Sequence, residues 1–319
     1  MIPAPPKKPD FRHPAFFNRF VIPSLVLKTA YRIGMGRKAF LKAGEKFQKE
    51  QLKEDPFGDY QPIKGDIFAT VYSKSGTNLL LQALVQISYR GNADFKHIHD
   101  LVAWPEGPFK GIIPLEHPYP RAANPMGIRV IKTHKPTTVV PYNETGTYIP
   151  MIRDPKEVFV SAYHFMPRVF GIEKLVGVDD WLEAFLSDGF MVGPWADHLH
   201  GWWALRDRPN VHPFFFRESI SQQEKFIDEL AGILNVELTP EEKARVVEKC
   251  SFAYMKENES KFGPPMFWFA RNKAKMMRKG KVGSSGELLT PEMKERIDTH
   301  FRNRLKTLGS DFPYEERFM

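Results

Sequence analysis

A lysine, two hydroxyl residues and a glycine directly follow a run of β-branched and aromatic residues at 66–73. These four residues are Lys74, Ser75, Gly76 and Thr77. A strongly apolar stretch, 77–89, comes next and predicts a buried helix. A loop that opens a helix presents free backbone N–H groups, and the helix dipole favours an anion there. The segment therefore predicts a phosphate-binding loop, although an ordinary strand-to-helix turn has the same outline.

The loop differs from the one that binds nucleotide triphosphates, which has the pattern G-x-x-x-x-G-K-[ST]. Here Lys74 precedes Gly76, and the first glycine of that pattern is missing. A P-loop kinase or other NTPase is nevertheless the alternative from the same fold class. The missing pattern and the lack of an evident strand-end aspartate for Mg²⁺ argue against it.

A lysine and a histidine two positions apart stand at the end of a second strand-like run, 127–133. Lys132 and His134 point to the same side if the strand continues to His134. A histidine titrates near neutrality and is suited to remove a proton, while a lysine can neutralise developing negative charge. An isolated histidine at a strand end is more often structural, so the pair alone leaves both roles open.

Two further groups of residues are candidates for binding an anion. Arg153 ends a third strand-like run, 146–153, and Ser161 lies eight residues later. An arginine fork with a hydroxyl is a suitable site for a terminal phosphate. Near the C-terminus, a basic run with a glycine contains Arg278, Lys279 and Gly280. Taken alone, the arginine is equally typical of a surface ion pair, and the basic run of a solvated loop.

The elements that must position these residues alternate between strand and helix. A fourth strand is expected at 211–216, and helices are expected at 77–89, 155–165 and 221–234. This alternation favours an α/β fold, with a central parallel sheet flanked by helices. Because no segment resembles a linker, we expect a single domain over 61–319, with 1–60 as a basic extension packed on it or flanking it.

Composition limits the classes of function without choosing one. The 319 residues carry a net charge of +8, which suits an anionic ligand, a nucleic acid or a membrane surface. The single cysteine excludes an internal disulfide, and together with the lack of a spanning or secretory segment it indicates a cytoplasmic protein. A basic nucleic-acid-binding module is a second alternative, but its motifs are absent, so no nucleic acid is expected as a partner.

Four blocks of the sequence together resemble the cytosolic-type sulfotransferases, which use the donor PAPS. Residues 72–77 are similar to the family's Y-P-K-S-G-T, with Ser73 in place of proline. Residues 132–134 are similar to its K-T-H, and 153–165 to its R-N-P-K-D-V-x-V-S-x-Y-x-F. The run at 278–283 is similar to R-K-G-x-x-G. The blocks occur in the family's order, and the resemblance extends from about residue 60 to the C-terminus.

The resemblance implies a P-loop-like sulfotransferase fold, PAPS as the donor co-substrate, PAP as the product, and no metal. It implies that His134 is the general base, while Lys132 and Lys74 neutralise charge on the sulfonate and on the leaving phosphate oxygen. The residues that it implies for donor binding are Lys74, Ser75, Gly76, Thr77, Asn78, Arg153, Ser161, Phe216, Cys250, Phe252, Arg278, Lys279 and Gly280.

The acceptor is expected to be a small molecule with a hydroxyl or an amine, which the sequence does not identify. Candidate walls of its pocket, for which plain core packing is the alternative, are Trp104, Phe109, Phe165 and Phe267. The family's dimer motif, K-x-x-x-T-V-x-x-x-E, would begin at Gly286, and two of its four fixed positions differ here. A homodimer is therefore one option, and the oligomeric state stays open.

Overall fold

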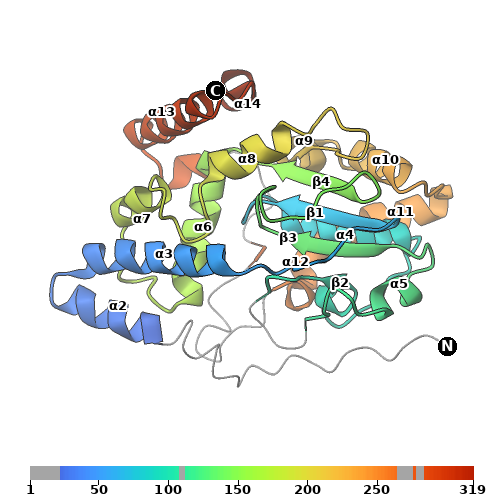
Figure 1. The fold of residues 1–319 in the computed structure, drawn as a ribbon, viewed down its shortest axis with the longest axis horizontal. Coiled ribbons are helices and arrows are strands. Elements are labelled where there is room, and N and C mark those ends of the chain that lie inside the picture. The colour runs from blue at the N-terminus through green and yellow to red at the C-terminus, as the bar shows by residue number, and fades with distance from the viewer. Residues whose placement is uncertain (1–21, 108–111, 264–275, 278–283) are drawn as a thin grey trace.

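Five parallel strands form one sheet in the order β2-β3-β1-β4-β5 (Figure 1). The computed structural model describes residues 22–107, 112–263, 276–277 and 284–319. In the sheet, Thr70 lies opposite Thr133 on one neighbour, and Val71 lies opposite Met151 on the other. The strands are β1 Asp66–Val71, β2 Val102–Ala103, β3 Arg129–Thr133, β4 Thr147–Ile152 and β5 Phe214–Phe215.

The predicted parallel α/β sheet is confirmed, with differences at its edges. The expected strand at 211–216 is reduced to β5, because a helix already begins at Phe216. The edge strand β2 has only two residues and was not predicted, since so short a segment has no periodicity. Among the helices of the described residues, none is long and apolar enough to span a membrane.

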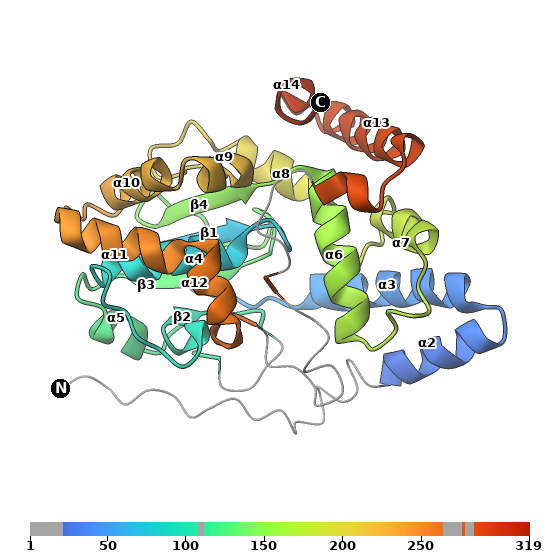
Figure 2. The same cartoon turned by 180° about the vertical axis from the view of Figure 1, so that it is seen from behind.

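Helices cover the sheet because alternate strand residues point to opposite faces. On β1, Ile67, Ala69 and Val71 join a core with α4 Thr77–Ser88, α10 Gln223–Ile233 and α11 Pro240–Cys250 (Figure 2). Phe68 points to the other face and stacks on Tyr148 at 4.9 Å. The shorter helices are η2 Ile98–Asp100, α5 Tyr119–Ala123, α9 Phe216–Ser221, α12 Phe252–Glu257, η3 Glu259–Lys261 and η4 Ser284–Glu287.

A second helical region lies beyond the carboxyl ends of the strands, on the left of Figure 1. Its aromatic core includes Phe159, Trp181 and Phe301, and Tyr72, just after β1, joins the same cluster. This region therefore forms a wall behind the loops that leave the sheet. Its helices are α6 Pro155–Val169, α7 Val178–Phe185, α8 Trp195–Trp203, α13 Pro291–Thr307 and α14 Tyr314–Phe318.

Of two N-terminal helices, α3 Gly36–Lys53 packs along α7, and α2 Ile22–Arg32 packs against α3. Leu27 and Phe40 are buried in the second helical region, and Phe40 lies 6.0 Å from the ring of Trp181. The Tyr31 hydroxyl donates a hydrogen bond to Asp180 at 2.9 Å. The described part of the basic extension is thus a helical hairpin that shares the core of the rest of the chain.

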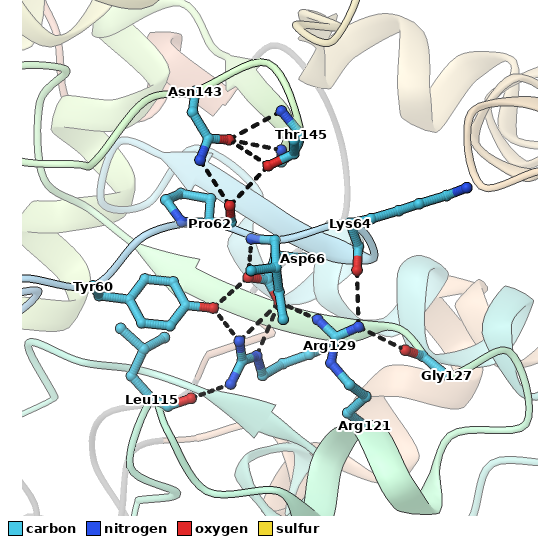
Figure 3. A network of polar contacts seen from close by, with 12 residues as sticks. Tyr60, Pro62, Lys64, Asp66, Leu115, Arg121, Gly127, Arg129, Asn143 and Thr145 are labelled. Atoms are coloured by element: carbon cyan, nitrogen blue, oxygen red, sulfur yellow. Dashed lines mark hydrogen bonds and ion pairs between the residues drawn. The ribbon is translucent and has the colours of Figure 1, made fainter.

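A buried charge network fixes the amino ends of β1 and β3 (Figure 3). Asp66 is completely buried, and its Oδ1 accepts from Arg129 Nε at 3.0 Å and from Arg121 Nη2 at 2.6 Å. The Tyr60 hydroxyl bonds to both Asp66 and Arg129. Because a buried carboxylate needs such partners, the network specifies which residues of the two strands face each other.

Candidate active site

The sheet topology brings the candidate catalytic residues to one edge. Strands β1 and β3 are parallel neighbours, so the loop after Val71 and the residues after Thr133 leave the sheet side by side. Strand β4 lies on the other side of β1 and ends just before Arg153. Three of the four blocks found in the sequence therefore converge at the carboxyl ends of three adjacent strands.

The loop between β1 and α4 has the geometry of an anion-binding turn. Lys74 and Gly76 both have positive φ, at 69° and 101°, and no side chain caps the N-terminus of α4. A Cβ on Gly76 would lie 2.4 Å from a ring carbon of Phe216, so only glycine fits there. The Ser75 hydroxyl is buried and has no hydrogen-bond partner within the described ranges. Unpaired amides and this hydroxyl fit a phosphate group.

His134 has a defined tautomer. Its Nδ1 lies 2.5 Å from the carbonyl oxygen of Val71, which can only accept, so Nδ1 carries the proton and Nε2 keeps a lone pair. Burial, and secondly the charge of Lys132, lower the pKa of His134 to about 3. The imidazole is therefore neutral throughout the neutral pH range.

Lys132 lies beside the aromatic ring of Trp104 and near the carboxylate of Glu106. Its Nζ is 3.3 Å from the centre of the Trp104 ring, and that ring meets His134 edge-on at 5.9 Å. Burial lowers the pKa of Lys132 to about 7, and the nearby carboxylate of Glu106 opposes that effect. Trp104 therefore contacts both candidate catalytic side chains at the end of β3, as a residue of the acceptor pocket would.

Lys74 approaches the same centre from β1. Its Nζ lies 3.8 Å from the centre of the Phe165 ring of α6. Burial lowers the pKa of Lys74 to about 7, with a further contribution from the positive charges of Arg153 and Lys132. Three cationic side chains thus repel one another in a buried space, which is a favourable environment for a polyanion.

Arg153 connects the second block to the first. Its Nη1 donates to the carbonyl oxygen of Lys74 at 2.9 Å, and its Nε donates to Glu157 at 3.1 Å. The guanidinium also covers the Phe216 ring at 4.2 Å. Ser161 lies two turns into α6 and is half-buried. Because Arg153 bonds directly to the loop between β1 and α4, a substitution of Arg153 would affect both sequence blocks.

The comparisons with known proteins agree with this geometry. Residues 64–309 match the family model described as the sulfotransferase domain. That match covers well over half of the chain. The chain belongs to the sulfotransferase family.

Named relatives and a solved structure are similar over most of this sulfotransferase. It is 29% identical to sulfotransferase 2A1 of Macaca fascicularis, covering 78% of this chain and 88% of the relative. It is 27% identical to 3-alpha-hydroxysteroid sulfotransferase of Cavia porcellus, covering 75% and 83%. The fold matches retinol dehydratase in complex with androsterone and PAP, with a TM-score of 0.68 and 21% identity over 83% of this chain and 88% of that one. The predictions of the family, the fold and a sulfotransferase enzyme are confirmed.

The other residues predicted to bind the donor differ in burial and in the segments that they contact. Asn78 Nδ2 donates to the carbonyl oxygen of Phe262 at 3.2 Å, so it ties α4 to the chain beyond α12. Cys250 is only 2% exposed and packs in the core between α4 and α11. Phe252 is half-buried at the start of α12. Phe109, Phe267, Arg278, Lys279 and Gly280 lie outside the described residues.

Two residues near the candidate catalytic groups were missed as candidates by the sequence reasoning. Glu106 Oε1 accepts the backbone N–H of His134 at 2.6 Å, across 28 positions of sequence. Asp154 caps the N-terminus of α6 through the backbone N–H of Lys156 at 2.8 Å. Glu106 follows β2 and lies outside the four sequence blocks. A carboxylate that bonds a distant backbone amide has no local pattern.

Proposed function

We propose that this sulfotransferase transfers the sulfonate group of PAPS to the hydroxyl or amine of a small molecule. The observation that carries the proposal is the tautomer of His134, whose Nε2 lone pair is left available by the bond from Nδ1 to Val71. A base with this orientation, beside two lysines with lowered pKa values, fits proton removal next to a transferring anion.

The proposed reaction is an in-line displacement at sulfur. His134 Nε2 takes the proton of the acceptor hydroxyl, and the acceptor oxygen forms a bond to the sulfur of the sulfonate. The bond between sulfur and the bridging oxygen of the 5′-phosphate breaks, and its electron pair leaves with PAP. Lys132 neutralises the sulfonate, and Lys74 neutralises the departing phosphate oxygen. Catalysis then rests on positioning and charge, as in phosphoryl transfer.

Donor binding prepares these groups for the reaction. A pKa near 3 leaves His134 a weak base in the free protein. Negative charge from the donor would offset the neighbouring lysines and raise that pKa, because opposite charges favour the protonated imidazole. The same charge would keep Lys74 and Lys132 protonated. The negative charges of the donor's phosphates and sulfonate would thus set the protonation states that the reaction needs. The proposal requires no metal.

The proposal assigns the two ends of the donor to two blocks. The loop of Ser75 and Gly76 would hold the 5′-phosphosulfate, which its unpaired donors support. Arg153 and Ser161 would hold the 3′-phosphate, with Phe216 against the nucleotide. Trp104 and Phe165 would line the acceptor pocket, because both rings contact the proposed catalytic lysines.

The proposed acceptor class is a lipophilic alcohol, first of all a hydroxysteroid. The names of the relatives and the androsterone in the matching structure point in this direction. An aromatic wall beside the base supports it, since such a wall would pack against apolar rings. The proposed location is the cytoplasm.

The test combines binding with transfer. PAP should raise the melting temperature with EDTA present, because a ligand that binds only the folded state stabilises it. ATP with Mg²⁺ should not, and the opposite result would favour a kinase. A panel of hydroxysteroids, phenols and amines with labelled PAPS then identifies the acceptor. If PAP binds and no member of a broad panel is labelled, the transfer activity is contradicted.

A further inference from the structure

Glu106 is the single acidic side chain that acts on Lys132, in β3, within the described chain. Its Oε1 accepts the backbone N–H of His134 at 2.6 Å, and the carboxylate also hydrogen-bonds the Thr133 side chain. Its other oxygen, Oε2, is buried and has no hydrogen-bond partner among the described residues. One carboxylate therefore holds two successive residues beside Lys132 and still has an unsatisfied oxygen.

The surroundings of Lys132 make this carboxylate important. The ammonium lies against the face of Trp104 at 3.3 Å, so that ring replaces water on one side. From the part of the chain that the structure describes, Glu106 alone acts to raise the pKa of Lys132. The other titratable groups that interact with the lysine charge are Lys74, His97, His99 and His134.

None of these other groups supplies negative charge. Lys74 is a cation that comes from the loop after β1. Burial lowers the pKa values of the three histidines, so they are neutral at neutral pH. Before a donor arrives, Lys132 therefore depends on one carboxylate to remain charged in a buried position.

We propose that Glu106 is the internal counter-ion of Lys132 and a positioning residue for the catalytic end of β3. In the free enzyme it supplies the negative charge that the sulfonate supplies after the donor binds, so a larger fraction of Lys132 is protonated when PAPS arrives than would be without Glu106. Through its bond to the N–H of His134, it also fixes the base relative to that lysine. The inference rests on the proposed function in one respect, namely that Lys132 acts on the sulfonate.

The counter-ion role of Glu106 can be distinguished from a purely structural role, because Glu106→Gln removes the charge and keeps the size of the side chain. The amide oxygen of glutamine can still accept the N–H of His134. Lys132, without its counter-ion, should lose its proton at lower pH. An opposite charge at close range typically shifts a pKa by about 1–3 units, so the midpoint should fall by about one pH unit or more.

The experiment measures the protonation of Lys132 directly and independently of activity. The full-length enzyme is labelled with [¹³Cε]lysine, the Lys132 signal is assigned with Lys132→Arg, and its shift is followed from pH 5.5 to 10. The pH profile of kcat/KM for PAPS is recorded in parallel, since it reports groups of the free enzyme. Glu116→Gln is the matched control, because Glu116 is exposed and lies ten positions further along the chain.

The inference predicts that Glu106→Gln lowers the titration midpoint of Lys132 and moves the alkaline limb of kcat/KM to lower pH by a similar amount. Glu116→Gln should change neither quantity. Glu106→Asp keeps the charge and should leave the midpoint closer to that of the wild type, which provides a second variant if the glutamine form is unstable. An unchanged Lys132 midpoint, or equal midpoints in the aspartate and glutamine variants, would overturn the inference. A shifted midpoint with an unshifted activity profile would uphold the counter-ion and refute the role proposed for Lys132.

Discussion

Gly76→Ala is the substitution whose effect can be worked out most directly from the structure. At φ 101°, an alanine is held in a backbone conformation that costs about 1–3 kcal/mol. Its Cβ would also lie 2.4 Å from a ring carbon of Phe216 and 2.7 Å from the sulfur of Met151. Such overpacking typically costs about 1–3 kcal/mol more.

The loss of stability should be accompanied by a loss of donor affinity. Phe216 cannot move away freely, because its ring lies 4.2 Å from the guanidinium of Arg153. That arginine in turn holds the carbonyl of Lys74. A change of about 2–6 kcal/mol corresponds to a fall in melting temperature of about 3–9 °C in a protein of 319 residues, at an unfolding entropy of about 2.1 cal/mol/K per residue. PAP should bind at least tenfold more weakly to the protein that remains folded.

Gly232→Ala is the matched control for differential scanning calorimetry and PAP titration. Gly232 lies inside α10, and a Cβ there would meet nothing within 4 Å. Alanine should stabilise that helix by up to about 1 kcal/mol and leave PAP binding unchanged. If Gly76→Ala melts like the wild type and binds PAP normally, the steric argument for the phosphate loop is wrong.

Three further predictions concern the proposed chemistry. His134→Ala should lower turnover by about 10²–10⁴ with donor binding nearly intact. A more acidic acceptor should partly restore this variant but not Lys132→Met, and equal restoration of both would contradict the assignment of the base. Arg153→Ala should weaken PAP binding by about 1.5–3 kcal/mol in calorimetric titration and should change acceptor affinity much less, whereas an unchanged PAP affinity would show that this block is misassigned. Because Lys74 and Lys132 have pKa values of about 7 in the free protein, PAP affinity should be highest below pH 7 and should fall as the pH rises above it, with proton uptake on binding. A pH-independent affinity between pH 6.5 and 9 would mean that neither lysine needs to be charged for binding.

Much of the fold was predictable because its strands and helices have strong local patterns. The β-branched run before Lys74 became β1, and the apolar stretch after Gly76 became α4. Thr239 is followed by a proline and two acids, a local pattern typical of a helix start, and the structure has a capping box there with Glu242. These features depend on neighbouring residues only, so the sequence alone is sufficient to find them.

The parts that were not predicted depend on contacts between distant segments. The tautomer of His134 is set by a carbonyl on the adjacent strand, 63 positions away. The contact of Lys132 with Trp104 and the bond from His134 to Glu106 both require the segment after η2 to lie over β3. The sequence spacing predicts that Lys132 and His134 lie at one strand end. It does not identify the residues that determine their charge and orientation.

The charge network of Asp66 and Arg129 has a consequence for how this protein can diversify. The network fixes the pairing of β1 with β3 at the amino ends of these strands (Figure 3). The proposed chemistry lies at their carboxyl ends. Substitutions around Trp104 therefore alter the wall of the proposed acceptor site, away from the charged groups that align β1 with β3. New acceptor preferences can thus evolve, or be selected in the laboratory, by small steps that leave the pairing of β1 with β3 in place.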